Sequence, residues 1–135
     1  MWVVLNEAVI KTVAAFMNSS GGTLAIGLSD EGEVLGIQAD LEMKNHDLDT
    51  YENWLTTLLA SALGGAAAMN ASIRFEAVQE LTVCLVDVSP TSAPVFADTF
   101  KGNHRFYVRN NNSTRVLEGQ ELITYVRSRF GVPQG

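Results

Sequence analysis

Basic and hydrogen-bonding side chains that are able to bind phosphate gather in the last third of the sequence. Residues 98–135 contain six basic and three acidic side chains, whereas residues 1–97 contain three basic and twelve acidic ones. Arginine suits phosphate because its planar guanidinium matches two phosphate oxygens, and asparagine and serine add neutral donors. The sequence therefore predicts a nucleic-acid-binding surface that consists of Lys101, Arg105, Tyr107, Arg109, Asn112, Ser113 and Arg115.

In a strand over residues 104–109, successive side chains would point to opposite faces of the sheet. Alternation places Arg105, Tyr107 and Arg109 on one face and the apolar residues between them on the other. A basic face with an aromatic ring at its centre suits a single strand of nucleic acid, whose bases stack on such rings. The alternative is an exposed face whose arginines form ion pairs with nearby acidic residues. The whole chain, with a net charge of −6, lacks the basic excess that is typical of nucleic-acid-binding proteins.

The sequence predicts neither a metal site nor a catalytic nucleophile. Its two histidines, His46 and His104, and its one cysteine, Cys84, form no pair at the spacing of metal ligands. Cys84 lies in the apolar run 81–86, where we expect a small buried residue, and the continuous apolar strand over 81–88 is expected to be central in the sheet. A lone cysteine cannot form an internal disulfide, and the sequence shows neither a signal peptide nor an apolar run that could span a bilayer. We therefore expect a cytoplasmic protein without a membrane partner.

A helix, a glycine turn and a strand over residues 5–28 form the segment against which we expect the rest of the chain to fold. Apolar side chains recur at steps of three and four along the helix, namely at Leu5, Val9, Val13, Phe16 and Met17. The helix should end in the turn-forming residues 18–22, and residues 29–33 should turn the strand so that residues 34–37 return as its hairpin partner. The structural motif of this segment consists of Asn18, Gly21, Gly22, Gly27 and Gly36.

The rest of the sequence predicts alternating helices and hairpins. The expected elements are, in order, a loop over 38–47, a helix over 49–63, strands over 73–77 and 81–88, a hairpin of 95–97 with 104–109, a turn over 110–113 and a helix over 119–130. Asp49 and Glu52 have the spacing of a capping box for the second helix, and Gln79 and Glu80 are expected to form a tight turn. We predict an α+β fold with a mixed, mostly antiparallel sheet of hairpins and about three helices packed on it, as one domain over residues 1–135.

Two blocks of the sequence, residues 14–37 and residues 106–114, resemble the Schlafen AlbA-like domain family, also called the divergent AAA family. The run AAFMNSSGGTLAIGL over residues 14–28 is similar to its first signature, and DEGEVLGI over residues 30–37 is similar to the turn that follows. FYVRNNNST over residues 106–114 is similar to a later family segment, in which Arg109 matches the motif arginine. The resemblance covers about residues 5–130. It implies a nucleic-acid-binding module, often the N-terminal part of a bacterial transcriptional regulator.

The same resemblance implies an incomplete catalytic site. Family members that cleave RNA hold a divalent cation with three carboxylates, of which one aspartate follows the first strand and matches Asp30. The two glutamates would precede the first helix, and this chain starts after that place. Because a hard cation needs several oxygen ligands, we expect neither a bound cation nor cleavage from this chain alone. A nuclease domain without its upstream glutamates, and a protein-interaction or dimerisation domain, remain alternative functions.

Nucleotide binding, which the older family name suggests, is not favoured by the sequence. A phosphate loop precedes a helix and ends in lysine and a hydroxyl residue, whereas Gly21 and Gly22 follow a helix and lack both.

The start of the chain carries two further expectations. The first helix opens with Trp2, Val3 and Val4 and has no capping residue, so we expect the natural domain to extend upstream of Met1. Apolar surface left uncovered there would be buried in a homodimer, which is the commonest symmetric assembly.

Overall fold

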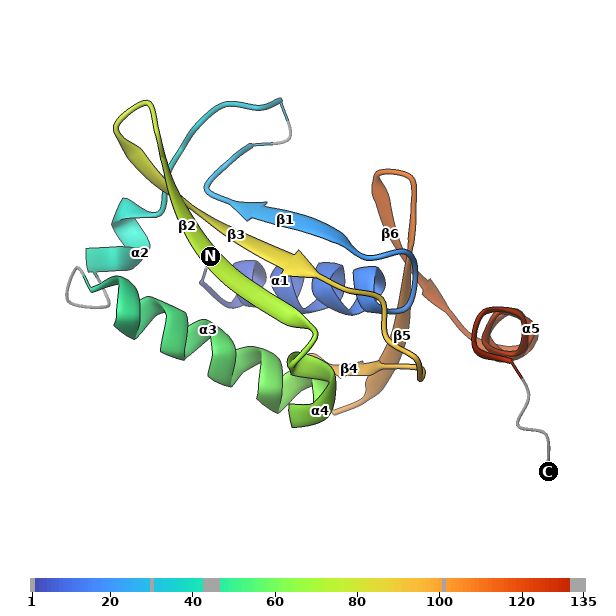
Figure 1. Ribbon diagram of the computed structural model, residues 1–135. Coiled ribbons are helices and arrows are strands. Elements are labelled where there is room, and N and C mark those ends of the chain that lie inside the picture. Colours follow the sequence, from blue (N-terminus) through green and yellow to red (C-terminus); the bar gives the residue numbers. More distant parts are fainter. Residues whose placement is uncertain (1, 30, 43–46, 101, 132–135) are drawn as a thin grey trace.

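Two antiparallel three-stranded sheets and the helices between and around them make up the described part of the chain (Figure 1). The computed structural model describes residues 2–29, 31–42, 47–100 and 102–131, apart from the side chains of residues 2–5 and 42. The elements are α1 (Trp2–Met17), β1 (Gly22–Ile26), α2 (Gln38–Glu42), α3 (Leu48–Leu63), α4 (Gly65–Ala68), β2 (Ala71–Val78), β3 (Leu81–Val88), β4 (Phe96–Asp98), β5 (His104–Asn110), β6 (Ser113–Leu117) and α5 (Gly119–Phe130). The predicted α+β class is confirmed.

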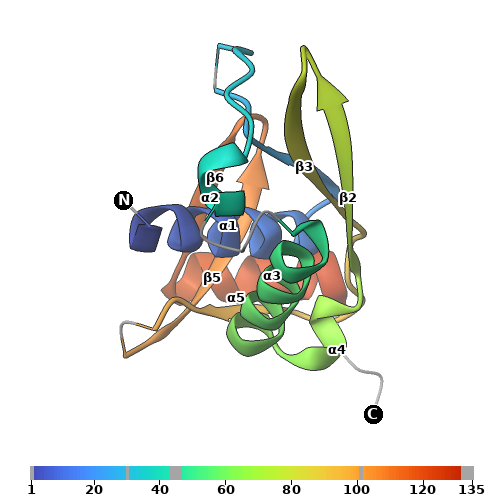
Figure 2. The ribbon, with the colours of Figure 1, turned by 90° about the vertical axis from the view of Figure 1, so that its left-hand side faces the viewer.

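Helix α1 lies between the two sheets (Figures 1 and 2). The first sheet has the order β1-β3-β2 and the second the order β4-β5-β6. The buried face of α1 packs against the first sheet and against Tyr107 of β5, and α3 packs beside it. Helix α5 covers the opposite face of the second sheet, where Phe106, Val108 and Leu117 meet its apolar side chains. The second sheet is therefore enclosed by helices on both faces.

Two sheets replace the one mixed sheet that the sequence predicted. Strand β3 is central in its sheet, as its continuous apolar run predicted, and Gln79 and Glu80 form the tight turn before it with φ angles of 52° and 65°. After Val88 the chain enters a segment with two prolines, at 90 and 94, which cannot donate to a sheet ladder. The chain therefore leaves the first sheet and starts the second at Phe96.

The turn between α1 and β1 requires glycine at two positions, because a side chain there would clash with neighbouring atoms. Gly21 has a φ of 77°, and a Cβ atom there would lie 2.6 Å from the carbonyl oxygen of Val88. A Cβ atom on Gly22 would lie 2.8 Å from the ring of Phe16. The N–H of Gly21 donates to the carbonyl of Phe16 over 2.9 Å and closes the end of the helix. The glycine pair thus lets the chain reverse directly against the core.

Asn18 ties the end of α1 to the second sheet. Its side chain is fully buried, and its Nδ2 donates to the carbonyls of Val95 and Tyr107 over 2.9 Å each. The N–H of Val95 donates to Asn18 Oδ1, also over 2.9 Å. A buried amide of this kind is stable only when its donors and acceptor are satisfied, so Asn18 fixes where β4 and β5 lie against α1.

The expected hairpin after β1 does not form as a ladder. Residues 34–37 contribute one isolated bridge, between Leu28 and Val34, and the N–H groups of Leu35 and Gly36 both donate to the carbonyl of Gly27. Gly27 and Gly36 have φ angles of 107° and 73°, which interrupt an extended strand. The chain is thereby directed so that the N–H of residue 37 donates to the carbonyl of residue 82.

Two further sequence predictions need correction, and one strand was not predicted at all. Helix α3 is capped by Asp47, whose Oδ1 accepts from the N–H of Asp49 over 3.0 Å, so Asp49 lies inside the helix. Helix α2 occupies part of the segment that was expected to be a loop. Strand β6 was not predicted, because its residue types do not alternate, although the burial of its side chains in the structure does. Residue His46 and the side chains of residues 2–4 lie outside the described residues.

Within the described residues, no helix has both the length and the apolar character that crossing a membrane requires.

Candidate nucleic-acid interface

Strand β5, which carries three of the seven predicted binding residues, is covered on both faces. Tyr107 is only 5% exposed because α1 packs over that face, and Lys11 Nζ lies 5.8 Å from the centre of its ring. Phe106 and Val108 face α5 on the other side. The prediction of an open basic face with Tyr107 at its centre is therefore wrong. The sequence correctly placed Phe106 and Val108 on the face of β5 opposite to Tyr107. Alternation within a strand does not show, however, which helix covers each face.

Arg109, the motif arginine, lies where the end of α1 meets β5 and β6. Its Nη1 donates to Thr114 Oγ1 over 2.8 Å, and its guanidinium lies 5.3 Å from the centre of the Phe16 ring. The backbone N–H of Arg109 donates to Ser19 Oγ over 2.9 Å. Arg109 is half-buried, and its guanidinium is held in place by these contacts with Thr114 and Phe16.

Arg105 and Arg115 both form ion pairs with glutamates at the start of α5. Arg115 Nη2 lies 2.5 Å from Glu121 Oε2, and Arg105 Nη1 lies 3.8 Å from Glu118 Oε1. All four side chains are about half exposed or more. Of the two arrangements that the sequence left open, ion pairing is the one that these two arginines adopt. Exposed pairs of this kind contribute only about 0–1 kcal/mol, so an incoming anion can displace the carboxylates at small cost.

A groove of about 570 Å³ runs between the β5–β6 hairpin and α5. The strand wall carries Arg109, Asn110 and Arg115, and the helix wall carries polar side chains at positions 121, 124 and 128. Val108, Leu117 and Tyr125 complete its lining. Arg109 and Arg115 thus both line the groove, from opposite faces of the hairpin: the Arg109 guanidinium lies by Phe16 of α1, and Arg115 is paired with Val108 and faces Glu121.

The other predicted residues lie around this groove or outside it. Asn112 and Ser113 are exposed at the β5–β6 turn. Arg105 lines a separate pocket of about 300 Å³ near the start of α5. Lys101 lies outside the described residues. The sequence analysis missed the helix wall, Glu121, Thr124 and Ser128, although their spacing of three and four residues places them on one face of a helix.

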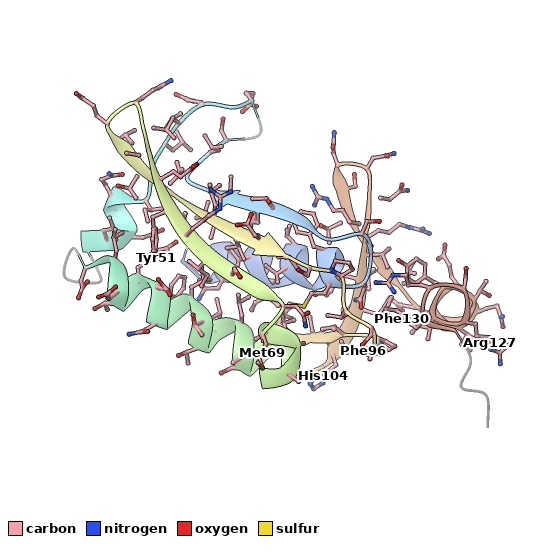
Figure 3. All side chains as sticks on the ribbon, in the orientation of Figure 1. Tyr51, Met69, Phe96, His104, Arg127 and Phe130 are labelled. Carbon is pink, nitrogen blue, oxygen red and sulfur yellow. The ribbon has the colours of Figure 1, made fainter. Side chains whose placement is uncertain are left out.

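Helix α5 is anchored to the turn that follows α1. Tyr125 Oη donates to the carbonyl of Asn18 over 2.6 Å, and Arg129 Nη2 donates to the carbonyls of Ser19 and Thr91 over 3.1 and 3.0 Å. A guanidinium at the carbonyl end of α1 is favourable because the helix dipole is negative there. Phe130 lies on the side of α5 that faces the sheet, and Arg127 points away from it (Figure 3). The groove therefore has two firmly placed walls.

Metal ligands do not gather in the part of the chain that the structure describes. None of its histidine, cysteine, aspartate and glutamate side chains form a group of three that could hold a metal ion. Asp30, the residue that matches the family's catalytic aspartate, lies outside the described residues. Cys84 is fully buried in β3, as expected, and this burial, with a smaller effect of the Glu52 charge, raises its pKa to about 12. The thiol therefore stays protonated at neutral pH.

The family to which this fold belongs follows from comparison with known proteins. Residues 2–118 match the protein family described as Schlafen, AlbA_2, and the chain belongs to this family. The match ends at Glu118, so α5 lies beyond it.

A solved structure shares the fold. The DIP2311 protein from Corynebacterium diphtheriae superposes with a TM-score of 0.66 at 21% sequence identity, over 94% of this chain and 23% of that one. This chain therefore corresponds to less than a quarter of the length of that protein. None of the proteins of curated function matches.

Proposed function

We propose that this chain is a nucleic-acid-binding module and that it binds the phosphate backbone of RNA or DNA along the groove between β5–β6 and α5. The observation that carries the proposal is the meeting of Arg109 and Arg115 with Asn110 in one groove of about 570 Å³. Membership of the Schlafen, AlbA_2 family supports a function that involves nucleic acid.

The groove has the chemistry that a phosphate chain needs. A guanidinium group binds two phosphate oxygens at once, and Asn110, which lines the same groove, adds a neutral donor. The exposed turn residues Asn112 and Ser113 continue this row of donors beyond the groove. Such contacts position the backbone without reading the base sequence, so we expect binding that depends little on sequence.

The binding should be weak and sensitive to salt. The chain carries a net charge of −6, so only a local positive surface attracts the ligand. If two phosphates are neutralised, the logarithm of the affinity for a single strand should fall with the logarithm of salt with a slope of about −1.4.

We further propose that the module works within a larger protein, such as a bacterial transcriptional regulator. This chain spans 23% of the Corynebacterium protein that shares its fold, which leaves room for other domains in proteins of this kind. A weak module that binds the backbone would then raise the affinity of a partner domain that reads the sequence, because linked sites bind together.

Two matched arginine variants test the proposed site. Arg115→Ala removes one positive charge and one exposed ion pair beside the groove. Arg74→Ala removes one positive charge on β2, together with the exposed ion pairs of Arg74 with Asp87, over 2.7 Å, and with Glu76, over 3.3 Å. In a fluorescence anisotropy titration with a labelled single-stranded RNA of mixed sequence, at low salt, Arg115→Ala should weaken binding about fivefold and Arg74→Ala should not. Equal affinities for the two variants would contradict the proposal.

A further inference from the structure

The ion pairs that α5 makes with the second sheet suggest how the proposed site is regulated. Glu118 directly precedes α5 and Glu121 lies in its first turn, and each holds one of the predicted phosphate-binding arginines. The Arg115–Glu121 pair is the shorter, at 2.5 Å, and the Arg105–Glu118 pair spans 3.8 Å. Both arginines that project from this sheet toward solvent thus already have an anionic partner from the same short stretch of chain.

The position of these glutamates is set by the docking of α5 and does not depend on the ion pairs. Tyr125 and Arg129 donate to the carbonyls of Asn18 and Ser19, and four apolar side chains of α5 pack on the sheet. The glutamate side chains themselves are 73% and 55% exposed. The docked helix therefore holds the backbone of both glutamates beside the arginines, while each exposed carboxylate can rotate into solvent.

We propose that Glu118 and Glu121 act as a built-in competitor of phosphate for Arg105 and Arg115, an inference that rests on the proposed function. A phosphate that approaches either arginine must displace a carboxylate and must then remain close to its negative charge. Both effects oppose binding, and both weaken when the glutamates are neutralised or when salt screens their charge. The structure therefore shows a low-affinity form of the site, with the Arg115–Glu121 pair in the groove and the Arg105–Glu118 pair in the separate pocket near the start of α5.

The energetic range of exposed ion pairs sets the size of the effect. Neutralising one glutamate should raise the affinity about two- to fivefold, and neutralising both should raise it about tenfold. The gain should disappear at high salt because the charges are exposed to solvent and are screened.

The alternative explanation of these glutamates is purely structural. Acidic residues near the start of a helix are stabilised by its dipole, so Glu118 and Glu121 would favour α5 even without any ligand. A structural role predicts a change in the stability of α5 on substitution, but no gain in affinity that depends on Arg105 and Arg115.

Glutamine variants separate these possibilities, because glutamine keeps the size of glutamate and removes its charge. The test protein is Glu118→Gln/Glu121→Gln. Its matched control is Glu52→Gln/Glu80→Gln, which changes the net charge by the same amount at two exposed positions on α3 and the β2–β3 turn. Both are titrated, with the wild type and Arg115→Ala, against a fluorescein-labelled single-stranded RNA of mixed sequence at low and high potassium chloride.

The proposal expects the test variant to bind about tenfold more tightly than the wild type at low salt, and the control to bind nearly as the wild type does. The gain should be lost when Arg105→Ala and Arg115→Ala are added to the test variant. An equal gain in the control, or a gain that persists without the two arginines, would overturn it. If the wild type binds and Arg115→Ala weakens binding, unchanged affinity of the test variant overturns this inference alone. If neither the wild type nor the test variant binds, the proposed function fails as well.

Discussion

Removal of the Asn18 side chain should destabilise the fold strongly, because this buried amide joins α1 to the second sheet. Asn18→Ala leaves the N–H and the carbonyl of Val95 and the carbonyl of Tyr107 without the partner each has now. Each lost bond costs about 1 kcal/mol, and a buried group left unsatisfied costs more, so the free energy of unfolding should fall by about 3 kcal/mol. For a chain of this size that corresponds to a drop of about 10 °C in the melting temperature.

Urea denaturation, followed by circular dichroism, measures this loss. Asn53→Ala, the same substitution at an exposed position of α3, serves as the control and should change the stability by less than about 0.5 kcal/mol. If Asn18→Ala unfolds within that same margin of the wild type, the reasoning about the buried amide is refuted.

Asn18→Asp refines the test, because it keeps the oxygen that accepts from Val95 and replaces the donor. An ionised carboxylate would face the carbonyls of Val95 and Tyr107, so its folded pKa should be raised above the unfolded value of about 3.9. A raised folded pKa means that the variant is most stable below about pH 4 and loses stability as pH rises through the folded pKa. A variant whose urea midpoint, relative to the wild type, does not change with pH would show that the site is open to water.

Three further predictions concern other parts of the fold. Gly21→Ala should lower the free energy of unfolding by about 2 kcal/mol or more, because the φ of Gly21 is 77° and the new Cβ atom would lie 2.6 Å from the carbonyl oxygen of Val88. Gly64→Ala, also at positive φ but with open space around it, should lower it by about 1 kcal/mol. Equal losses for the two variants in urea denaturation would contradict this prediction. Cys84, buried and with a pKa of about 12, should react with a thiol reagent at neutral pH only after unfolding, and rapid reaction of the native protein would show that β3 opens. The expected homodimer should appear in multi-angle light scattering as a mass of twice the 14.6 kDa of the chain, and a monomer across a wide range of concentration would count against it.

The sequence was informative where a pattern reports local structure. The continuous apolar run of β3 predicted a central strand, and the helical spacing after Gly119 predicted α5. Both patterns involve residues that are close in the sequence, and the period of such a pattern indicates a strand or a helix without knowledge of the rest of the chain.

The predictions failed where distant segments decide the outcome. Asparagine is common in turns, and only the folded chain shows that the hydrogen-bond partners of the Asn18 side chain lie 77 and 89 positions away in the sequence. Tyr107 belongs to an alternating strand, but whether its face meets solvent depends on where α1 packs. The glutamates opposite Arg105 and Arg115 could not be assigned to them from sequence, because the partner of an exposed charge is set by how α5 docks on the sheet.

The most direct test of the proposed nucleic-acid site is a map of the residues that the ligand touches. Backbone amide signals of the isotope-labelled chain are followed by NMR during a titration with single-stranded RNA at low salt. We predict that the shifts concentrate on both walls of the groove, at Arg109, Asn110 and Arg115 in the hairpin and at Thr124 and Ser128 in α5. Shifts that concentrate on the outer face of the β1-β3-β2 sheet, or that spread evenly over the chain, would contradict the account.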